Sequence, residues 1–186
     1  MKKLMSILFA VCICLSVCGA LSSCEGQQKT TVTEAEWNAA FEADNVTVEG
    51  FITERDEQES LLMKITKEAI YTENDGYISF VKKLEDGWHF YKNGQFGSVV
   101  NGVSASVRFA MQSFHLPEYA SFIFDEETKS YVYINQGTSG FYQFNVYFEN
   151  GVIVKIEGRE DRGSVTHSFL FKNYGATVAE MPSENE

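Results

Sequence analysis

Apolar and polar residues alternate along several short stretches of the chain, which is the pattern of β-strands with one buried face. The clearest stretches are residues 61–66, 141–148 and 165–171. Their apolar residues fall on one side of each strand: Leu61, Met63 and Ile65; Tyr142, Phe144, Val146 and Phe148; Val165, His167, Phe169 and Phe171. The opposite sides are mostly polar but keep some aromatic residues, such as Phe141 and Tyr147. The pattern predicts a sheet wrapped around an apolar core or cavity.

Tight-turn dipeptides separate many of the strand-like stretches. Such pairs supply the positive φ angles of β-hairpin turns, and there are five: Asp75-Gly76, Asp86-Gly87, Asn93-Gly94, Asn101-Gly102 and Asn150-Gly151. We expect strands at residues 46–53, 61–66, 68–73, 77–84, 88–91, 121–124, 131–135, 141–148, 152–157 and 165–171. The predicted fold class is α+β, mainly β, with one large curved antiparallel meander sheet of about ten strands.

An N-terminal amphipathic helix is predicted at residues 34–43. Thr33 and Glu36 have the spacing of a capping box, in which each side chain bonds the backbone of the other residue. Trp37 and Phe41 follow at helical spacing. Their shared face must lie on an apolar surface, and the sheet is the only candidate.

A mid-chain helix is predicted at residues 103–114, where the two halves of the sheet join. Apolar residues recur there at helical spacing: Val103, Val107, Ala110, Met111 and Phe114. Pro117 follows, and a proline shortly after such a run is typical of a helix end.

The N-terminal segment has the pattern of a secretory signal. Met1-Lys2-Lys3 is cationic, and residues 4–21 are apolar apart from two serines. The tetrad Leu21-Ser22-Ser23-Cys24 resembles the lipobox of bacterial lipoproteins. That resemblance implies cleavage before Cys24 and attachment of acyl chains such as palmitate to its thiol, which anchor a protein to a membrane. The alternative is an uncleaved signal anchor in which Cys24 is unmodified.

These features divide the chain into four parts: a signal peptide at 1–23, a lipidated tether at 24–32, a single domain at 33–178 and an acidic tail at 179–186. The four cysteines all precede the domain: Cys12, Cys14, Cys18 and Cys24. The domain therefore has no disulfide framework and no thiol chemistry. We expect it at the cell membrane or outer membrane, lipid-anchored and outside the cytoplasm.

The charge of the chain argues against two kinds of partner. The formal net charge is −11, and removal of Lys2 and Lys3 with the signal peptide would lower it to −13. Nucleic acid is not expected as a partner, because phosphate binding needs a basic face. Direct contact of the domain with an anionic membrane surface is equally unfavourable. We expect a monomer that meets the membrane only through its N-terminal lipid.

The residues that could carry chemistry do not form a recognised catalytic or metal motif. His89, His115 and His167 lie in different predicted elements, and no two have a metal-ligand spacing. Gly137-Thr138-Ser139-Gly140 lacks the glycine pattern of a nucleophile elbow and is typical of a loop. Asp125-Glu126-Glu127 indicates a hairpin turn, with a calcium site as the alternative. We expect no cofactor, no metal and no enzymatic activity.

The order of the elements resembles that of a known family. After the capped helix, the sheet and the mid-chain helix come Phe124-Asp125-Glu126-Glu127-Thr128-Lys129-Ser130-Tyr131 and then Phe169-Leu170-Phe171-Lys172-Asn173-Tyr174-Gly175-Ala176-Thr177-Val178. Over residues 33–178 this layout is similar to the lipoprotein-carrier half-barrel proteins, the LolA/LolB-like group. The resemblance implies an unclosed barrel, or half-barrel, that carries acyl chains in an apolar cavity plugged by a helix. No arginine of this chain matches the ligand-gating arginine of that group.

The first functional hypothesis is a non-enzymatic envelope lipoprotein that binds a lipid or another hydrophobic ligand in the half-barrel cavity. The candidate ligand-binding residues are Met63, Phe144, Phe148, His167, Phe169 and Phe171. Each could instead fill the core, and His167 could be a hydrogen-bonded core histidine.

The alternative is a surface interaction or scaffold protein that recognises protein or glycan and has no internal cavity. A hydrolase would require a Ser or Asp bonded to a histidine in a cleft. A cavity of several hundred cubic ångströms inside the sheet would favour the first hypothesis, and a filled core would favour the second.

Overall fold

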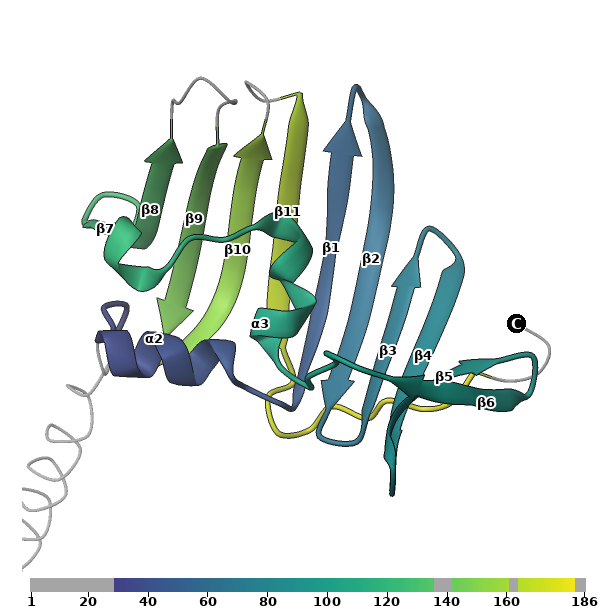
Figure 1. The fold of residues 1–186 in the computed structure, drawn as a ribbon. Helices are drawn as coiled ribbons and strands as arrows, with labels where there is room; N and C mark the ends of the chain where they lie inside the picture. Colours follow the sequence, from purple (N-terminus) through teal and green to yellow (C-terminus); the bar gives the residue numbers. More distant parts are fainter. Residues whose placement is uncertain (1–28, 136–141, 161–163, 183–186) are drawn as a thin grey trace, which may run out of the picture.

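The computed structural model describes residues 29–135, 142–160 and 164–182, which form one curved, open sheet with short helices on one face (Figure 1). The predicted fold class is confirmed. The described elements are α2 (Glu34–Phe41), β1 (Val46–Glu54), β2 (Glu57–Thr66), β3 (Ala69–Asn74), β4 (Tyr77–Leu84), β5 (Gly87–Lys92), β6 (Gln95–Val100), α3 (Val107–Ala110), η1 (Gln112–Phe114), η2 (Tyr119–Ser121), β7 (Ile123–Asp125), β8 (Ser130–Asn135), β9 (Tyr142–Glu149), β10 (Val152–Glu160) and β11 (Val165–Lys172). The predicted signal peptide, Cys24 and the loop at 137–140 lie outside the described residues.

The first and last strands of the sheet pair with each other at its centre. The eleven described strands are antiparallel, in the order β6-β5-β4-β3-β2-β1-β11-β10-β9-β8-β7. β1 pairs with β11 from Thr47 opposite Lys172 to Glu54 opposite Val165. Two meanders, β1–β6 and β7–β11, therefore run outward from the centre. The segment from β6 to β7 crosses from one edge of the sheet to the other through α3, η1 and η2 (Figure 1).

Most of the predicted turns connect hairpins. Three pairs place both residues at positive φ, as type I′ turns require: Asp75-Gly76, Asn93-Gly94 and Asn150-Gly151. Asn101-Gly102 instead begins the crossover after β6. The β1–β2 hairpin turns at Arg55 (φ 50°) and Asp56 (φ 73°), which are also left-handed but include no glycine. The sequence carries no glycine signal for this turn.

The N-terminal helix begins where its capping box predicts. Thr33 Oγ1 accepts a hydrogen bond from the Glu36 backbone N–H (3.3 Å), and Glu36 Oε2 accepts one from the Thr33 N–H (2.8 Å). The Lys29 ammonium and Thr33 hold the pKa of Glu36 at about 2. The helix ends at Phe41 and buries Trp37 against the sheet.

The mid-chain helix is much shorter than its predicted range of 103–114. Ser106 is the N-cap, because its Oγ accepts from the Phe109 backbone N–H (3.2 Å), so the helix begins at Val107. It ends after one turn at Ala110, and η1 continues the path. His115 then adopts a left-handed φ of 49°, which ends the helical run before Pro117.

Part of the predicted tether packs on the domain. The Lys29 carbonyl accepts from the Asn150 backbone N–H (3.0 Å) in the β9–β10 turn. The Val32 N–H donates to the Tyr131 hydroxyl (2.8 Å), and Tyr119 Oη donates to the Val32 carbonyl (3.2 Å). Residues 29–32 are therefore joined to both the β9–β10 turn and the aromatic core.

Two glycines allow aromatic rings to lie directly on the strand backbone of the helix-covered face. A Cβ at Gly158 of β10 would lie 2.8 Å from Phe144 Cε1. A Cβ at Gly50 of β1 would meet the Ser168 carbonyl oxygen and lie 2.7 Å from Phe169 Cδ1. These contacts are closer than packed atoms tolerate, so the positions require glycine.

We predict that Gly50→Ala lowers the free energy of unfolding by about 1–3 kcal/mol, because its methyl group would collide with a backbone carbonyl that cannot rotate away. The matched control is Gly97→Ala in β6, where the nearest atom to a new Cβ is 3.7 Å away. Urea unfolding followed by circular dichroism measures both variants. Equal midpoints would contradict the packing described for Gly50.

Candidate functional site

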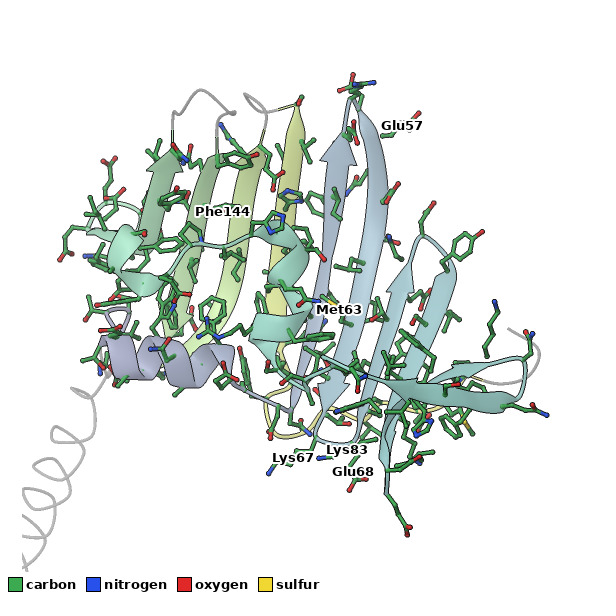
Figure 2. All side chains as sticks on the ribbon, viewed as in Figure 1. Glu57, Met63, Lys67, Glu68, Lys83 and Phe144 are labelled. Carbon is green, nitrogen blue, oxygen red and sulfur yellow. The ribbon has the colours of Figure 1, made fainter. Side chains whose placement is uncertain are left out.

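The six residues that the sequence predicts as a ligand site lie together on the helix-covered face. They come from β2, β9 and β11: Met63, Phe144, Phe148, His167, Phe169 and Phe171. Figure 2 labels Met63 and Phe144, which lie on well-separated strands of the sheet. Each of the six side chains is at most 7% exposed. The sequence therefore grouped them correctly, and their contact with a ligand stays a prediction.

Side chains from the helices occupy the space above these residues. The Trp37 ring of α2 contacts the ring of Phe148, with centroids 5.3 Å apart. Phe114 of the crossover lies against Phe169 and His167, at 4.8 and 4.9 Å. A described cavity between α2 and the crossover has about 190 Å³. That volume is below the roughly 300–1,000 Å³ of small-molecule sites.

Two larger cavities adjoin on the opposite, helix-free face of the sheet. They have volumes of about 450 and 410 Å³, and they share Phe51 and Ser168. We call their combined surface the sheet groove. Its side chains come from β1, β2, β3, β9, β10 and β11: Glu49, Phe51, Ser60, Leu62, Glu73, Gln143, Asn145, Glu157, Arg159, Thr166, Ser168 and Leu170. His167, which the sequence predicts as a ligand residue, also lines the larger of these cavities. None of the other groove side chains was predicted as part of a site.

Strand register places the groove residues in rows across the sheet. One row runs through five neighbouring strands: Ser60, Phe51, Ser168, Glu157 and Asn145 are successive cross-strand partners. Because neighbouring strands lie about 4.8 Å apart, this row extends roughly 19 Å. An extended ligand that lay in the groove would cross the strands rather than follow one of them.

Neutral polar groups and one aromatic ring dominate the row. Phe51 is 38% exposed although it lies near the centre of the sheet. Gln143 Nε2 donates to Asn145 Oδ1 (3.1 Å), and Asn145 Nδ2 donates to Ser130 Oγ (3.1 Å). These bonds hold the amide groups in fixed orientations beside the groove.

The acidic group of the row is neutralised by its neighbours. Glu157 Oε2 accepts from the Tyr147 hydroxyl (2.8 Å), and Glu157 Oε1 lies 2.6 Å from Lys155 Nζ. Burial opposes ionisation of this carboxyl, but the bonds from Lys155 and Tyr147 prevail and lower the pKa of Glu157. Burial, with the adjacent carboxylate, raises the pKa of Tyr147 to about 12. Arg159 is exposed, and its charge also contributes to the lowered pKa of Glu157.

The histidines do not assemble a catalytic group within the part of the chain that the structure describes. His89 Nε2 lies 2.8 Å from Asp86 Oδ1, but its Nδ1 faces the Gly97 carbonyl at 2.7 Å, which leaves no nitrogen for a nucleophile. His167 Nε2 lies 3.2 Å from Glu160 Oε1. Burial lowers the pKa of His167 despite this carboxylate, and its Nδ1 has no hydrogen-bond partner. The ring is thus buried with one bonded nitrogen, and the choice between a core histidine and a pocket histidine stays a prediction.

The acidic cluster Asp125-Glu126-Glu127 lies in the β7–β8 hairpin, as the turn interpretation predicts. Asp125 Oδ1 accepts from the Glu127 backbone N–H (2.8 Å), and the Lys129 ammonium pairs with Glu126 (2.5 Å). Among the described residues, no group of three or more His, Cys, Asp or Glu could hold a metal ion. The bonds of Asp125 and Glu126 lie within the hairpin turn.

No protein-family model matches this chain, and no curated protein matches it either. The likeness to the LolA/LolB-like carriers therefore stays a prediction. A search of the described helices found none with the length and apolar character needed to cross a membrane.

We predict a pH-dependent stability from His89. Its two nitrogens both face acceptors, so only the imidazolium can donate both bonds, and the Gly97 carbonyl followed by Asp86 raises its pKa. The stabilisation is complete below the ordinary pKa of about 6.5 and is lost as pH rises through the higher folded pKa. Urea midpoints of the wild type and His89→Gln should converge as pH increases. A gap that is constant from mildly acidic to alkaline pH would contradict this assignment.

Proposed function

We propose that this chain is a membrane-anchored, non-enzymatic binding protein that holds a glycan strand in the sheet groove. The observation that carries the proposal is the contrast between the two faces of the sheet. The helix-covered face is filled by the protein's own aromatic side chains. The helix-free face has two adjoining cavities that meet at the exposed ring of Phe51.

The chemistry of the groove suits a sugar chain. Hydroxyl and amide groups such as those of Ser168 and Asn145 both donate and accept hydrogen bonds, as sugar hydroxyls do. An exposed phenyl ring offers a flat apolar surface for the C–H face of a sugar. A peptide that binds as a strand pairs with a sheet edge, and an amphipathic helix binds in an apolar groove. The row lies on the face of the sheet and contains mainly polar side chains, so it favours a glycan over either kind of peptide.

The anchor proposal and the fold together suggest an orientation. Lys29 is bonded to the β9–β10 turn, so only residues 25–28 separate it from Cys24. Five extended steps span at most roughly 18 Å. In this proposal the turn lies next to the bilayer, and the acidic β1–β2 tip with Glu57, at the other end of the strands in Figure 2, points away from it.

A lipid carrier is the second candidate. It is favoured by the position of Met63, Phe144 and the other predicted ligand residues, which are all buried on the helix-covered face. An acyl chain on that face would have to displace Trp37 or Phe114, because both rings now pack against the strands. Retention of extractable lipid by the purified protein would support the carrier over the glycan binder.

We predict that the protein binds at least one class of polysaccharide on an array of bacterial, plant and animal glycans, and that Phe51→Ala weakens this binding about tenfold through loss of the stacked ring. Phe90→Ala is the matched control, because Phe90 of β5 is also an exposed phenyl ring but lies outside the groove. Titration calorimetry with the bound glycan gives the two affinities. The proposal would be contradicted if the protein bound no glycan. It would also be contradicted if Phe51→Ala bound the glycan as tightly as Phe90→Ala.

We predict that Cys24→Ala releases the protein from the membrane in folded form, because the acyl chains supply the attachment. Membrane fractionation followed by circular dichroism of the soluble fraction measures both properties. A variant that stayed in the membrane fraction would indicate the uncleaved signal anchor instead.

A further inference from the structure

The two open edges of the sheet differ in how well they are protected. β7 has only three residues, of which the last is Asp125, and Glu126 and Glu127 follow it directly. Short length and charge are common ways of blocking a sheet edge. β6 has six residues, Gln95–Val100, and none of them is charged or a proline. No backbone hydrogen bond joins β6 to a described element other than β5.

Apolar side chains accompany the free backbone of β6. Val99 is 43% exposed and lies on the helix-free face, opposite His89. Phe90 of the neighbouring strand is exposed on the other face. Cross-strand partners share a face of the sheet, and the pairs Phe90–Val81, Val81–Ile70 and Ile70–Ile65 place Phe90 on the same face as Ile65, which is the helix-covered face. A strand added at β6 would therefore cover apolar surface on both sides of the sheet, as well as pairing with the exposed edge.

The absence of charged side chains on β6 makes this edge the place where a second copy can bind. A net charge of −11 makes most approaches of one copy to another repulsive. β6 is a stretch where two copies can meet without placing carboxylates opposite each other. An antiparallel edge also complements itself under a two-fold rotation, because the free N–H groups of each copy then lie opposite the free C=O groups of the other.

We propose that β6 is a dimerisation edge, at which β6 of one copy pairs antiparallel with β6 of a second copy so that two sheets become one. This pairing is independent of the glycan proposal, because the groove lies over β9, β10, β11, β1, β2 and β3. It replaces the monomer expected from the sequence with a symmetric dimer whose axis passes near the middle of β6.

The test uses the full chain, extracted in mild detergent, and a matched pair of edge variants. Val99→Glu and Ile123→Glu each replace an exposed β-branched residue on the helix-free face, one at each edge of the sheet. Analytical ultracentrifugation should give a dimer for the parent and for Ile123→Glu. Val99→Glu should raise the dissociation constant by about tenfold or more, because it places like charges across the two-fold axis.

A cross-linking experiment reports the position of the contact. Ser98→Cys should form a disulfide-linked dimer on mild oxidation, at a level well above the parent chain, which carries the same native cysteines. Ile123→Cys should stay at the parent level. A parent that sediments as a monomer at every concentration would overturn the proposal. Equal dimerisation by the two glutamate variants, or equal cross-linking by the two cysteine variants, would do the same.

Discussion

The pairing of β1 with β11 is the interaction on which the rest of this structure depends. It joins the first strand of the sheet to the last, and it places both at the centre with five strands on one side and four on the other. Side-chain bonds beyond the strands reinforce it, since Asn45 Oδ1 accepts from the Thr177 backbone N–H and the Thr47 and Thr177 hydroxyls lie 2.9 Å apart. Contacts between such distant segments are costly in chain entropy, so this pairing is also the step most expected to limit folding.

The central pairing also makes the two faces of the sheet different. Gly50 of β1 and Gly158 of β10 let the rings of Phe169 and Phe144 lie against the backbone on the helix-covered face. α2 and the crossover then close that face with Trp37 and Phe114. The other face receives no helix, so Phe51 remains partly exposed there. The helices that complete the core thereby leave the sheet groove open on the other face, lined by polar side chains together with Phe51, Leu62 and Leu170.

Local patterns predicted many of the elements, and the exceptions have physical causes. The capping box marked the start of α2, and most of the Asn-Gly and Asp-Gly pairs marked turns, because both signals act within four residues. β6 was missed because Gly97 interrupts the alternation of apolar and polar residues in its sequence. The pairing of β6 with β5 is also irregular, with a register shift between His89 and Tyr91. The mid-chain helix was overextended because Ser106 caps it three residues after the apolar periodicity begins.

The sequence by itself determined which side chains share a face, because alternation along a strand is a local property of the backbone. It thus grouped Met63, Phe144, Phe169 and their neighbours correctly. Only the tertiary structure decided that β1 pairs with β11, which face the helices cover, and that Phe51, Ser168 and Asn145 line one groove. The reason is that these groove residues come from three strands that are distant in sequence, and no local pattern encodes the register that brings such strands together.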